Sequence, residues 1–279
     1  MLPRRDWVVS AAIVARAFAK LRDVVTMSAA SFPVSVQDEA AILTLDRPNC
    51  LDIAGKHVLT DMLGELKDRE DLRALIIAGA HPQAFLVNVA ELADMSAEAA
   101  RDFSASGHAL AAALEALPFP AVAAVEGPAL GGGCELVLAC DLAFAGHGAS
   151  FGQIEAMGGV MPAFGGSWRL ARRIGYSRAL EMMFTGAVVD AETAKAYGLV
   201  LDTGERGGAL DAAKAFVRRL SQTRAASVAA IKAAAIYGWN RDPIDINRFE
   251  EDRFAALFGP EQSQRMHAFL ARQLELTKP

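Results

Sequence analysis

The fold is decided by residues 121–139, AVAAVEGPALGGGCELVLA, in which two apolar runs flank three consecutive glycines. The five apolar residues from Ala121 to Val125 suit a strand that is buried on both faces. The pair Gly127-Pro128 then marks a turn. The glycines Gly131 to Gly133 run directly into the apolar segment Cys134 to Ala139, which indicates the start of a helix. This stretch is therefore predicted to be a strand, a tight turn and a helix.

Strands and helices alternate on both sides of this stretch. Period-two and short apolar runs predict strands, whereas apolar residues spaced three and four apart predict helices. The predicted elements are a hairpin of Val34–Val36 and Ala41–Leu45 with a turn at Asp38-Glu39, a helix from Ile53 to Leu66, a strand at Leu75–Ala78, a helix capped by Ser96 and ending near Leu117, a strand at Asp141–Ala145, and mainly helices from about Gly165 to the end. This order predicts an α/β fold with a helical C-terminal region.

Bulk composition excludes several classes of protein. The chain has 279 residues, a formal net charge of −5 and no cluster of Lys and Arg, so a nucleic-acid partner is not expected. Three cysteines without a C-x-x-C pair and five scattered histidines support neither a disulfide framework nor a metal site. Buried thiols in a reducing compartment, and hence a cytoplasmic protein, are expected.

The N-terminus differs from the rest of the chain. Five basic residues interrupt its apolar stretch, so it lacks the ~18 apolar residues that a membrane helix needs. Two interpretations stay open, a basic amphipathic targeting peptide and an extension upstream of a start at Met27. We therefore predict three segments: an N-terminal extension (1–33) that is disordered or not translated, a core (34–205) and a helical C-terminal region (206–279).

Two turns and two carboxylates form a candidate site. The first N–H groups of a helix lack internal partners, and glycines such as Gly131 to Gly133 let a ligand approach them closely. A second turn, Asn88-Val89-Ala90-Glu91, has the form of an N-cap with Glu at the third position, which leaves the N–H of Val89 free. Glu135 and Glu155 accompany the glycines in apolar surroundings, where two carboxyl groups can take separate acid and base roles.

These motifs resemble the signature of the enoyl-CoA hydratase (crotonase) family. The likeness covers roughly residues 34–270. The matching segments are Arg47 to Asp52, Pro128 to Leu136, Cys140-Asp141, Phe151 to Glu155, Pro162, Gly165-Gly166, Arg169-Leu170, Gly186, Ala194 and Gly198 to Val200.

The resemblance implies a ClpP/crotonase-like spiral of ββα units with a helical trimerisation region, assembled as a homotrimer or a dimer of trimers. It implies a hydratase of enoyl-CoA thioesters in which Glu135 and Glu155 are catalytic. Gly132 and Val89 would supply the oxyanion-hole N–H groups, and Cys50, Leu51 and Val87 would line the coenzyme A crevice through backbone atoms. Neither a metal nor another cofactor is implied, because coenzyme A is part of the substrate.

Two segments depart from the family pattern. Val87 to Ala90 replaces Ala-Gly-Ala-Asp, so the turn loses its glycine and its aspartate; Asn88 tolerates positive φ, and the donor is a backbone N–H. Phe164 and Trp168 replace smaller residues. Their side chains either pack in the core in the ordinary way or line an acyl pocket that is shaped for an unusual substrate. We accordingly predict that the preferred acyl chain is not the standard short straight one.

Three alternatives compete with the hydratase. Within the family, the alternative is a Δ3-Δ2 enoyl-CoA isomerase, which needs only one glutamate, or another crotonase-family acyl-CoA enzyme. A crotonase-like binding partner without catalysis is a second alternative, suggested by the altered Asn88 turn. The third is a serine hydrolase, because Gly148-Ala149-Ser150-Phe151-Gly152 matches the G-x-S-x-G elbow.

Overall fold

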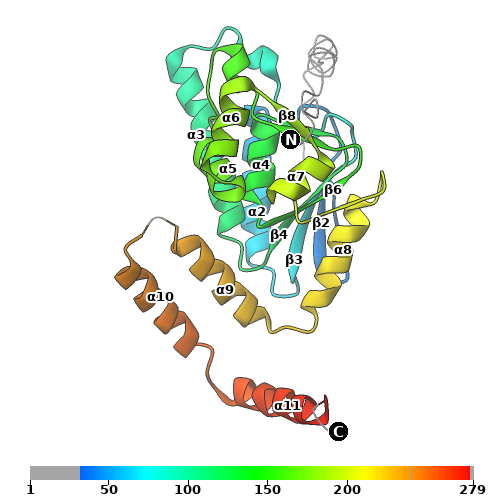
Figure 1. Ribbon diagram of the computed structural model, residues 1–279, viewed down its shortest axis with the longest axis vertical. Helices are drawn as coiled ribbons and strands as arrows, with labels where there is room; N and C mark the ends of the chain where they lie inside the picture. Colours follow the sequence, from blue (N-terminus) through cyan, green and yellow to red (C-terminus); the bar gives the residue numbers. More distant parts are fainter. Residues whose placement is uncertain (1–31, 240, 277–279) are drawn as a thin grey trace, which may run out of the picture. The chain divides into compact units, whose positions relative to one another are not determined.

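The computed structural model describes residues 32–239 and 241–276 and confirms the predicted α/β class (Figure 1). Nearly all of the predicted N-terminal extension, residues 1–31, lies outside the described residues. The predicted hairpin is present, with its turn at Asp38 and Glu39, both of which have positive φ.

A six-stranded sheet forms the centre of the fold, in the order β1-β2-β3-β4-β6-β9. β1 pairs antiparallel with β2, and every other neighbouring pair is parallel. The strands are β1 (Val34–Gln37), β2 (Ala40–Leu45), β3 (Ala74–Gly79), β4 (Ala121–Val125), β6 (Leu142–Gly146) and β9 (Asp202–Gly204).

Both faces of this sheet are covered, which explains its continuous apolar strands. Alternate residues such as Ile42 and Ile76 pack against α8 (Ala209–Leu220), on one side of the sheet in Figure 1. The intervening residues, such as Leu43 and Ile77, join a larger core with helices on the opposite face. The period of two in the strand therefore distributes its side chains between two apolar layers.

The helices near the larger core begin where the sequence predicted. Asp52 caps α2 (Ile53–Lys67) by accepting from the N–H of Gly55, and Ser96 caps α3 (Ala97–Glu115) by accepting from Ala99. The following helices of this part are α4 (Gly132–Ala139), α5 (Gly166–Ile174), α6 (Tyr176–Thr185) and α7 (Ala191–Tyr197).

A second sheet of three short strands was not predicted. β5 (Pro128–Leu130) pairs parallel with β7 (Ser150–Gly152), which pairs antiparallel with β8 (Val188–Asp190). Strands of three residues carry too few side chains to show an alternation of polar and apolar positions, so their pairing depends on tertiary contacts. This small sheet holds the two segments that precede Gly131 and Glu155.

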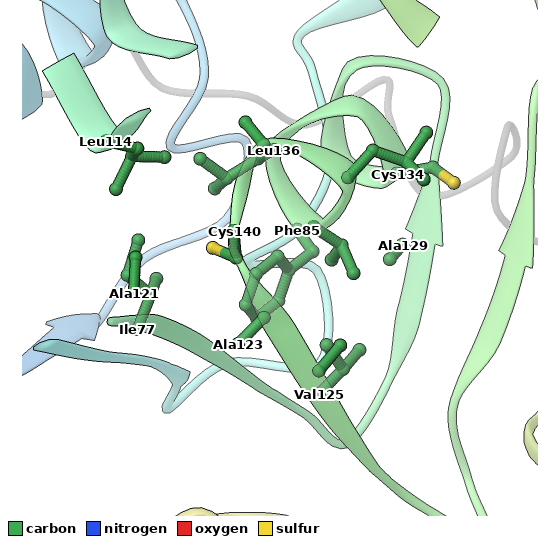
Figure 2. Close-up of a cluster of buried hydrophobic side chains, with 14 of the residues drawn as sticks. Ile77, Phe85, Leu114, Ala121, Ala123, Val125, Ala129, Cys134, Leu136 and Cys140 are labelled. Atoms are coloured by element: carbon green, nitrogen blue, oxygen red, sulfur yellow. The ribbon is translucent and has the colours of Figure 1, made fainter. Parts of the chain in front are cut away.

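Helix α4 lies entirely within the larger core, since all eight of its residues are buried. Figure 2 shows Ala123 and Val125 of β4 on the face towards α4, with the ring of Phe85 between strand and helix. Leu136 of α4 and Cys140, which follows the last residue of that helix, belong to the same cluster. A helix buried in this way gives its N-terminal N–H groups a fixed, dry environment.

The chain divides into two compact units, up to Ser221 and from Gln222 onwards. The second unit consists of α9 (Ala225–Tyr237), α10 (Pro243–Ala255) and α11 (Pro260–Leu276). The rings of Tyr237 and Phe249 stack with their centroids 4.0 Å apart and join α9 to α10. Among the described residues, no helix is both long and apolar enough to cross a membrane.

Candidate functional site

The glycine run is the turn between β5 and α4, and its geometry excludes larger residues. Gly131 has φ of +55° and ψ of −125°, a conformation that L side chains rarely adopt. A side chain on Gly133 would collide with the carbonyl oxygen of Phe85. Gly132 is the first residue of α4, so its N–H has no partner within the helix. The turn therefore presents a backbone donor at a helix N-terminus, beside the pocket that Gly132 lines.

Glu135 stands in the first turn of α4 and is 2% exposed. One carboxylate oxygen accepts from the N–H of Phe164 (2.7 Å) and of Gly166 (2.6 Å), and the other accepts from Ala163 (3.4 Å). Burial raises the pKa of Glu135, and these N–H groups together with the charge of Arg169 oppose the rise. The hydrogen bonds favour the ionised carboxylate in an otherwise apolar place.

Glu155 begins the short 3-10 helix η3 (Glu155–Gly158), which follows β7 after Gln153 and Ile154. Its carboxyl group lies over Gly131, where an added Cβ would come within 3.1 Å of Oε1. The amide of the fully buried Gln153, oriented to satisfy its partners, donates to both Glu155 oxygens at 2.8 and 3.1 Å. Burial, and then the charge of Glu135, raise the pKa of Glu155 to about 8.

The structure brings the two predicted glutamates together. An added Cβ on Gly166 would lie 2.8 Å from both the side-chain amide of Gln153 and Glu135 Cγ, so Gln153 lies between the two carboxyl groups. The Glu135 charge acts on Glu155, which also indicates that they are close. Because Glu155 keeps its proton at neutral pH while Glu135 is bonded to three N–H groups, the pair can serve as one acid and one base.

The second predicted turn is present as the 3-10 helix η2 (Val89–Leu92). Asn88 caps it by accepting from the N–H of Ala90 at 3.2 Å, as predicted. The tolerance of Asn88 for positive φ is not needed here, because its φ is −72° and the backbone is extended. Val89 is the first residue of this helix, so its N–H has no partner within it, and the residue is 37% exposed.

The three residues predicted to line the coenzyme A crevice are all buried. The Sγ of Cys50 donates to the carbonyl of Arg47 at 2.8 Å. Val87 lies beside Gly132, since a Cβ added to Gly132 would lie 2.5 Å from Cγ2 of Val87. Leu51 lines a narrow pocket together with Gly132 and Glu135.

The two aromatic residues that depart from the family pattern have different places. Phe164 lines the pocket, and its ring fills the space over Gly107 and Gly132. Trp168 is half-buried outside the pocket lining, and the guanidinium groups of Arg169 and Arg172 lie over its ring. Of the two, Phe164 is therefore the residue that shapes the pocket.

Three further residues of the site were not predicted, although the sequence held a signal for each. Gln153 and Arg169 stand within the quoted motifs, but their contacts are visible only in the fold. Gln153 donates hydrogen bonds to Glu155. Arg169 donates to the carbonyl of Phe164 at 2.7 Å and to the carboxylate of Glu115 at 2.6 Å. Lys56 occupies the buried face of α2 with Leu59 and Leu63 and lines the pocket. A charged residue on an apolar helix face was the signal for Lys56.

Neither a hydrolase elbow nor a metal cluster is found in the described part of the chain. Ser150 begins β7, where it pairs with Pro128 and Asp190, so it is not at the strand-to-helix turn that an elbow requires. Within residues 32–239 and 241–276, no group of three or more His, Cys, Asp or Glu side chains could hold a metal ion.

Known proteins resemble this chain in sequence and in fold. It is 31% identical over 243 residues to the short-chain-enoyl-CoA hydratase of Clostridium acetobutylicum, covering 85% of this chain and 93% of that protein. It is 33% identical over 243 residues to the crotonyl-CoA hydratase of Syntrophomonas wolfei, covering 85% and 94%. The enoyl-CoA hydratase of Bacillus anthracis superposes with a TM-score of 0.81 at 28% identity, covering 87% of this chain and 96% of that one. DspI of Pseudomonas aeruginosa superposes with a TM-score of 0.82 at 26% identity, covering 90% and 98%.

The profile of the enoyl-CoA hydratase/isomerase family matches residues 36–275, which is most of the chain. This match agrees with the motifs around Gly131 to Gly133 and with the superposition on a solved hydratase, and the fold is the crotonase fold. The chain therefore belongs to the enoyl-CoA hydratase/isomerase family.

Proposed function

We propose that this protein is an enoyl-CoA hydratase, which adds water reversibly and syn across the 2,3 double bond of an enoyl-CoA thioester to give a 3-hydroxyacyl-CoA. The observation that carries the proposal is the pair of carboxyl groups of the buried Glu135 and the half-buried Glu155, beside the N-terminus of α4. The names of the relatives agree with it. A binding partner without catalysis would have no use for two desolvated carboxyl groups.

The thioester carbonyl is held by backbone donors in this mechanism. As water adds to Cβ, electrons move from the double bond to the carbonyl oxygen, which becomes an enolate oxygen. The N–H groups of Gly132 and Val89 each begin a helical turn and donate to this oxygen. The dipole of the buried helix α4 adds positive potential at the same place.

The two carboxyl groups divide the proton transfers. Glu135, whose ionised form three backbone N–H groups favour against the effect of burial, takes a proton from water as the water oxygen bonds to Cβ. Glu155, which burial keeps protonated, gives its proton to Cα, and the carbonyl double bond forms again. Gln153 fixes the position of the Glu155 carboxyl group through two hydrogen bonds. After product release, exchange with solvent restores both protonation states.

The coenzyme A portion would lie along the backbone of Cys50, Leu51 and Val87. Asn49 supports this assignment, because its side chain is buried and neither its oxygen nor its nitrogen has a partner among the described residues. Buried polar atoms are usually satisfied, so a bound ligand is a suitable partner for Asn49. No further cofactor enters the mechanism.

The proposed assembly is a homotrimer or a dimer of trimers. The second unit exposes many large apolar side chains, which in a monomer would face water. They are Ile231, Trp239, Ile244, Phe254, Phe258, Met266, Phe269 and Leu270. A cytoplasmic location is supported by the three cysteines, which are all free and buried.

The proposal predicts that the full chain converts a trans-2-enoyl-CoA into the 3-hydroxyacyl-CoA, with one solvent deuterium at Cα in D₂O. The measurement is the loss of enoyl-thioester absorbance, with the product identified by mass spectrometry. A 3-enoyl-CoA substrate is run in parallel. Rapid migration of its double bond without any hydration of the 2-enoyl substrate would assign the chain to the isomerases instead.

The acid role of Glu155 predicts a pH dependence. Because its pKa is raised to about 8, Glu155 holds its proton below that pH and loses it above. The kcat/KM for hydration should therefore fall as pH rises through about 8, approaching tenfold per pH unit. A pH profile of kcat/KM over roughly two units on either side tests this. A rate that stays constant well above pH 8 would contradict the assignment of Glu155 as the acid.

A further inference from the structure

The pocket beside the proposed oxyanion hole contains one cation. Most of its lining is apolar or glycine, including Leu51, Leu110 and Phe164, and it also contains Gly132 and Glu135. Lys56 of α2 lines the same pocket and is completely buried. The place where an acyl group would lie therefore has an amino group in its wall.

Few contacts within the protein satisfy this amino group. Lys56 Nζ donates one hydrogen bond, to the carbonyl of Phe103 at 3.0 Å. It also lies 3.3 Å from the ring centroid of Phe103 and 4.3 Å from that of Phe164. An ammonium has three donors, so one is hydrogen-bonded and the aromatic faces provide the other contacts.

Packing alone does not explain a lysine at this position. Burial lowers the pKa of Lys56 to about 7, and only the more distant charges of Glu91, Asp52 and Glu135 oppose this. Among the described residues, no carboxylate forms an ion pair with it. Methionine has a similar length and would fill the same space without the cost of desolvating a cation. A polar ligand in the pocket would accept hydrogen bonds from the N–H groups of Lys56 that otherwise face only aromatic rings.

We propose that Lys56 recognises an oxygen acceptor on the acyl group, so that the substrate is an enoyl thioester whose chain carries a carboxylate or a carbonyl. This inference rests on the proposed hydratase function and specifies its substrate class. The oxygen would replace the ring of Phe164 as a partner of the amino group. It agrees with the expectation that the preferred acyl chain is not a plain short one.

The position of Phe164 limits how far the oxygen can be from the thioester. One edge of its ring contacts Gly132, and its centroid lies 4.3 Å from Lys56 Nζ. The amino group is thus separated from the proposed oxyanion donor by about one aromatic ring. An acyl chain of about six carbons would span this separation if it is extended.

The test compares three enoyl-CoA substrates of equal chain length, ending in a methyl group, a carboxylate or a ketone. The wild-type kcat/KM should be about 10- to 100-fold higher for at least one oxygenated chain than for the alkyl chain, the usual worth of a hydrogen bond to a charged group. The preferred oxygenated substrate identifies whether a carboxylate or a neutral carbonyl is recognised. Equal or lower kcat/KM for both oxygenated chains would overturn the proposal.

Lys56→Met should remove this preference, and Lys67→Met is its matched control. Lys67 is the exposed last residue of the same helix, so its replacement should leave the substrate ratio unchanged. The ratio of two kcat/KM values measured on one preparation does not depend on the folded fraction. If Lys56→Met lowers stability but keeps the wild-type ratio, Lys56 only joins α2 to α3 and the proposal is wrong.

Two further measurements keep the outcomes distinct. Lys56→Gln keeps a hydrogen-bond donor but no charge, and it replaces Lys56→Met in the test if the methionine variant does not fold. This variant should retain part of the preference for a carbonyl chain and lose the preference for a carboxylate chain. Turnover of the alkyl substrate by the wild type tests the hydratase function by itself. If none of the three substrates is hydrated, the proposed function fails, and the inference about Lys56 fails with it.

Discussion

Replacement of Glu155 by glutamine is expected to lower kcat for hydration by about 10²- to 10⁴-fold, the usual worth of a general acid. Glutamine has nearly the same shape, but it has no proton to give to Cα. The measurement is the steady-state rate on a 2-enoyl-CoA, together with deuterium incorporation at Cα in D₂O. The decline of kcat/KM above about pH 8, which we assign to Glu155, should also disappear in this variant.

The thermal stability of the Glu155→Gln variant shows whether its activity falls because the proton donor is missing or because the protein is less stably folded. Glu155 titrates at its ordinary value of 4.5 in the unfolded chain and at about 8 in the folded protein. Ionisation therefore destabilises the folded state progressively as pH rises between these values. Glutamine does not ionise, so the variant should melt at or above the wild-type temperature at pH 8. A loss of activity accompanied by a clearly lower melting temperature, or a kcat within a few-fold of wild type, would contradict the acid role.

Replacement of Glu135 by glutamine is expected to lower kcat by a similar factor of about 10² to 10⁴, because the base that activates water is removed. The amide oxygen can still accept from the N–H groups of Phe164 and Gly166. The amide nitrogen would face only the longer contact to Ala163 at 3.4 Å. The variant should therefore fold, and circular dichroism with thermal melting checks this beside the rate.

Glu126→Gln is the matched control for Glu135→Gln. Glu126 also accepts two backbone hydrogen bonds, from the N–H groups of Gly207 and Ala209 at 2.7 Å each. Each bond is on a different carboxylate oxygen, and Glu126 does not line the pocket. An amide nitrogen must face one of these donors, so this control should lose stability and keep its kcat. If Glu135→Gln behaved like Glu126→Gln, with a lower melting temperature and unchanged turnover, Glu135 would be a structural carboxylate and not the base.

Much of the main fold could be predicted because local patterns decide it. The strands β2, β3, β4 and β6 are apolar runs bounded by turns, and the caps Asp52 and Ser96 begin α2 and α3 within the chain itself. The short strands β5, β7, β8 and β9 could not be predicted in the same way. Three residues carry no readable period, and their backbone groups find partners only when distant segments meet.

The candidate site was predicted from motifs, whereas its chemistry depends on contacts between distant residues. The glycines next to Glu135 are contiguous in the chain, so a donor turn with a carboxylate could be read directly. The N–H of Gly166, however, reaches Glu135 from 31 residues away, and the N–H of Phe164 reaches it from 29 residues away. A hydrogen-bond partner at such a separation leaves no spacing to recognise.

By itself, the sequence determined the family, the crotonase fold and the identity of the two candidate glutamates, because each is encoded in contiguous motifs and apolar periods. Only the tertiary structure decided the protonation tendencies of these glutamates and the burial of Lys56 beside Phe164. The physical reason is that desolvation and electrostatic interactions depend on distances in space. A charged residue on a helix face has no defined environment until the opposing helices and loops have packed against it.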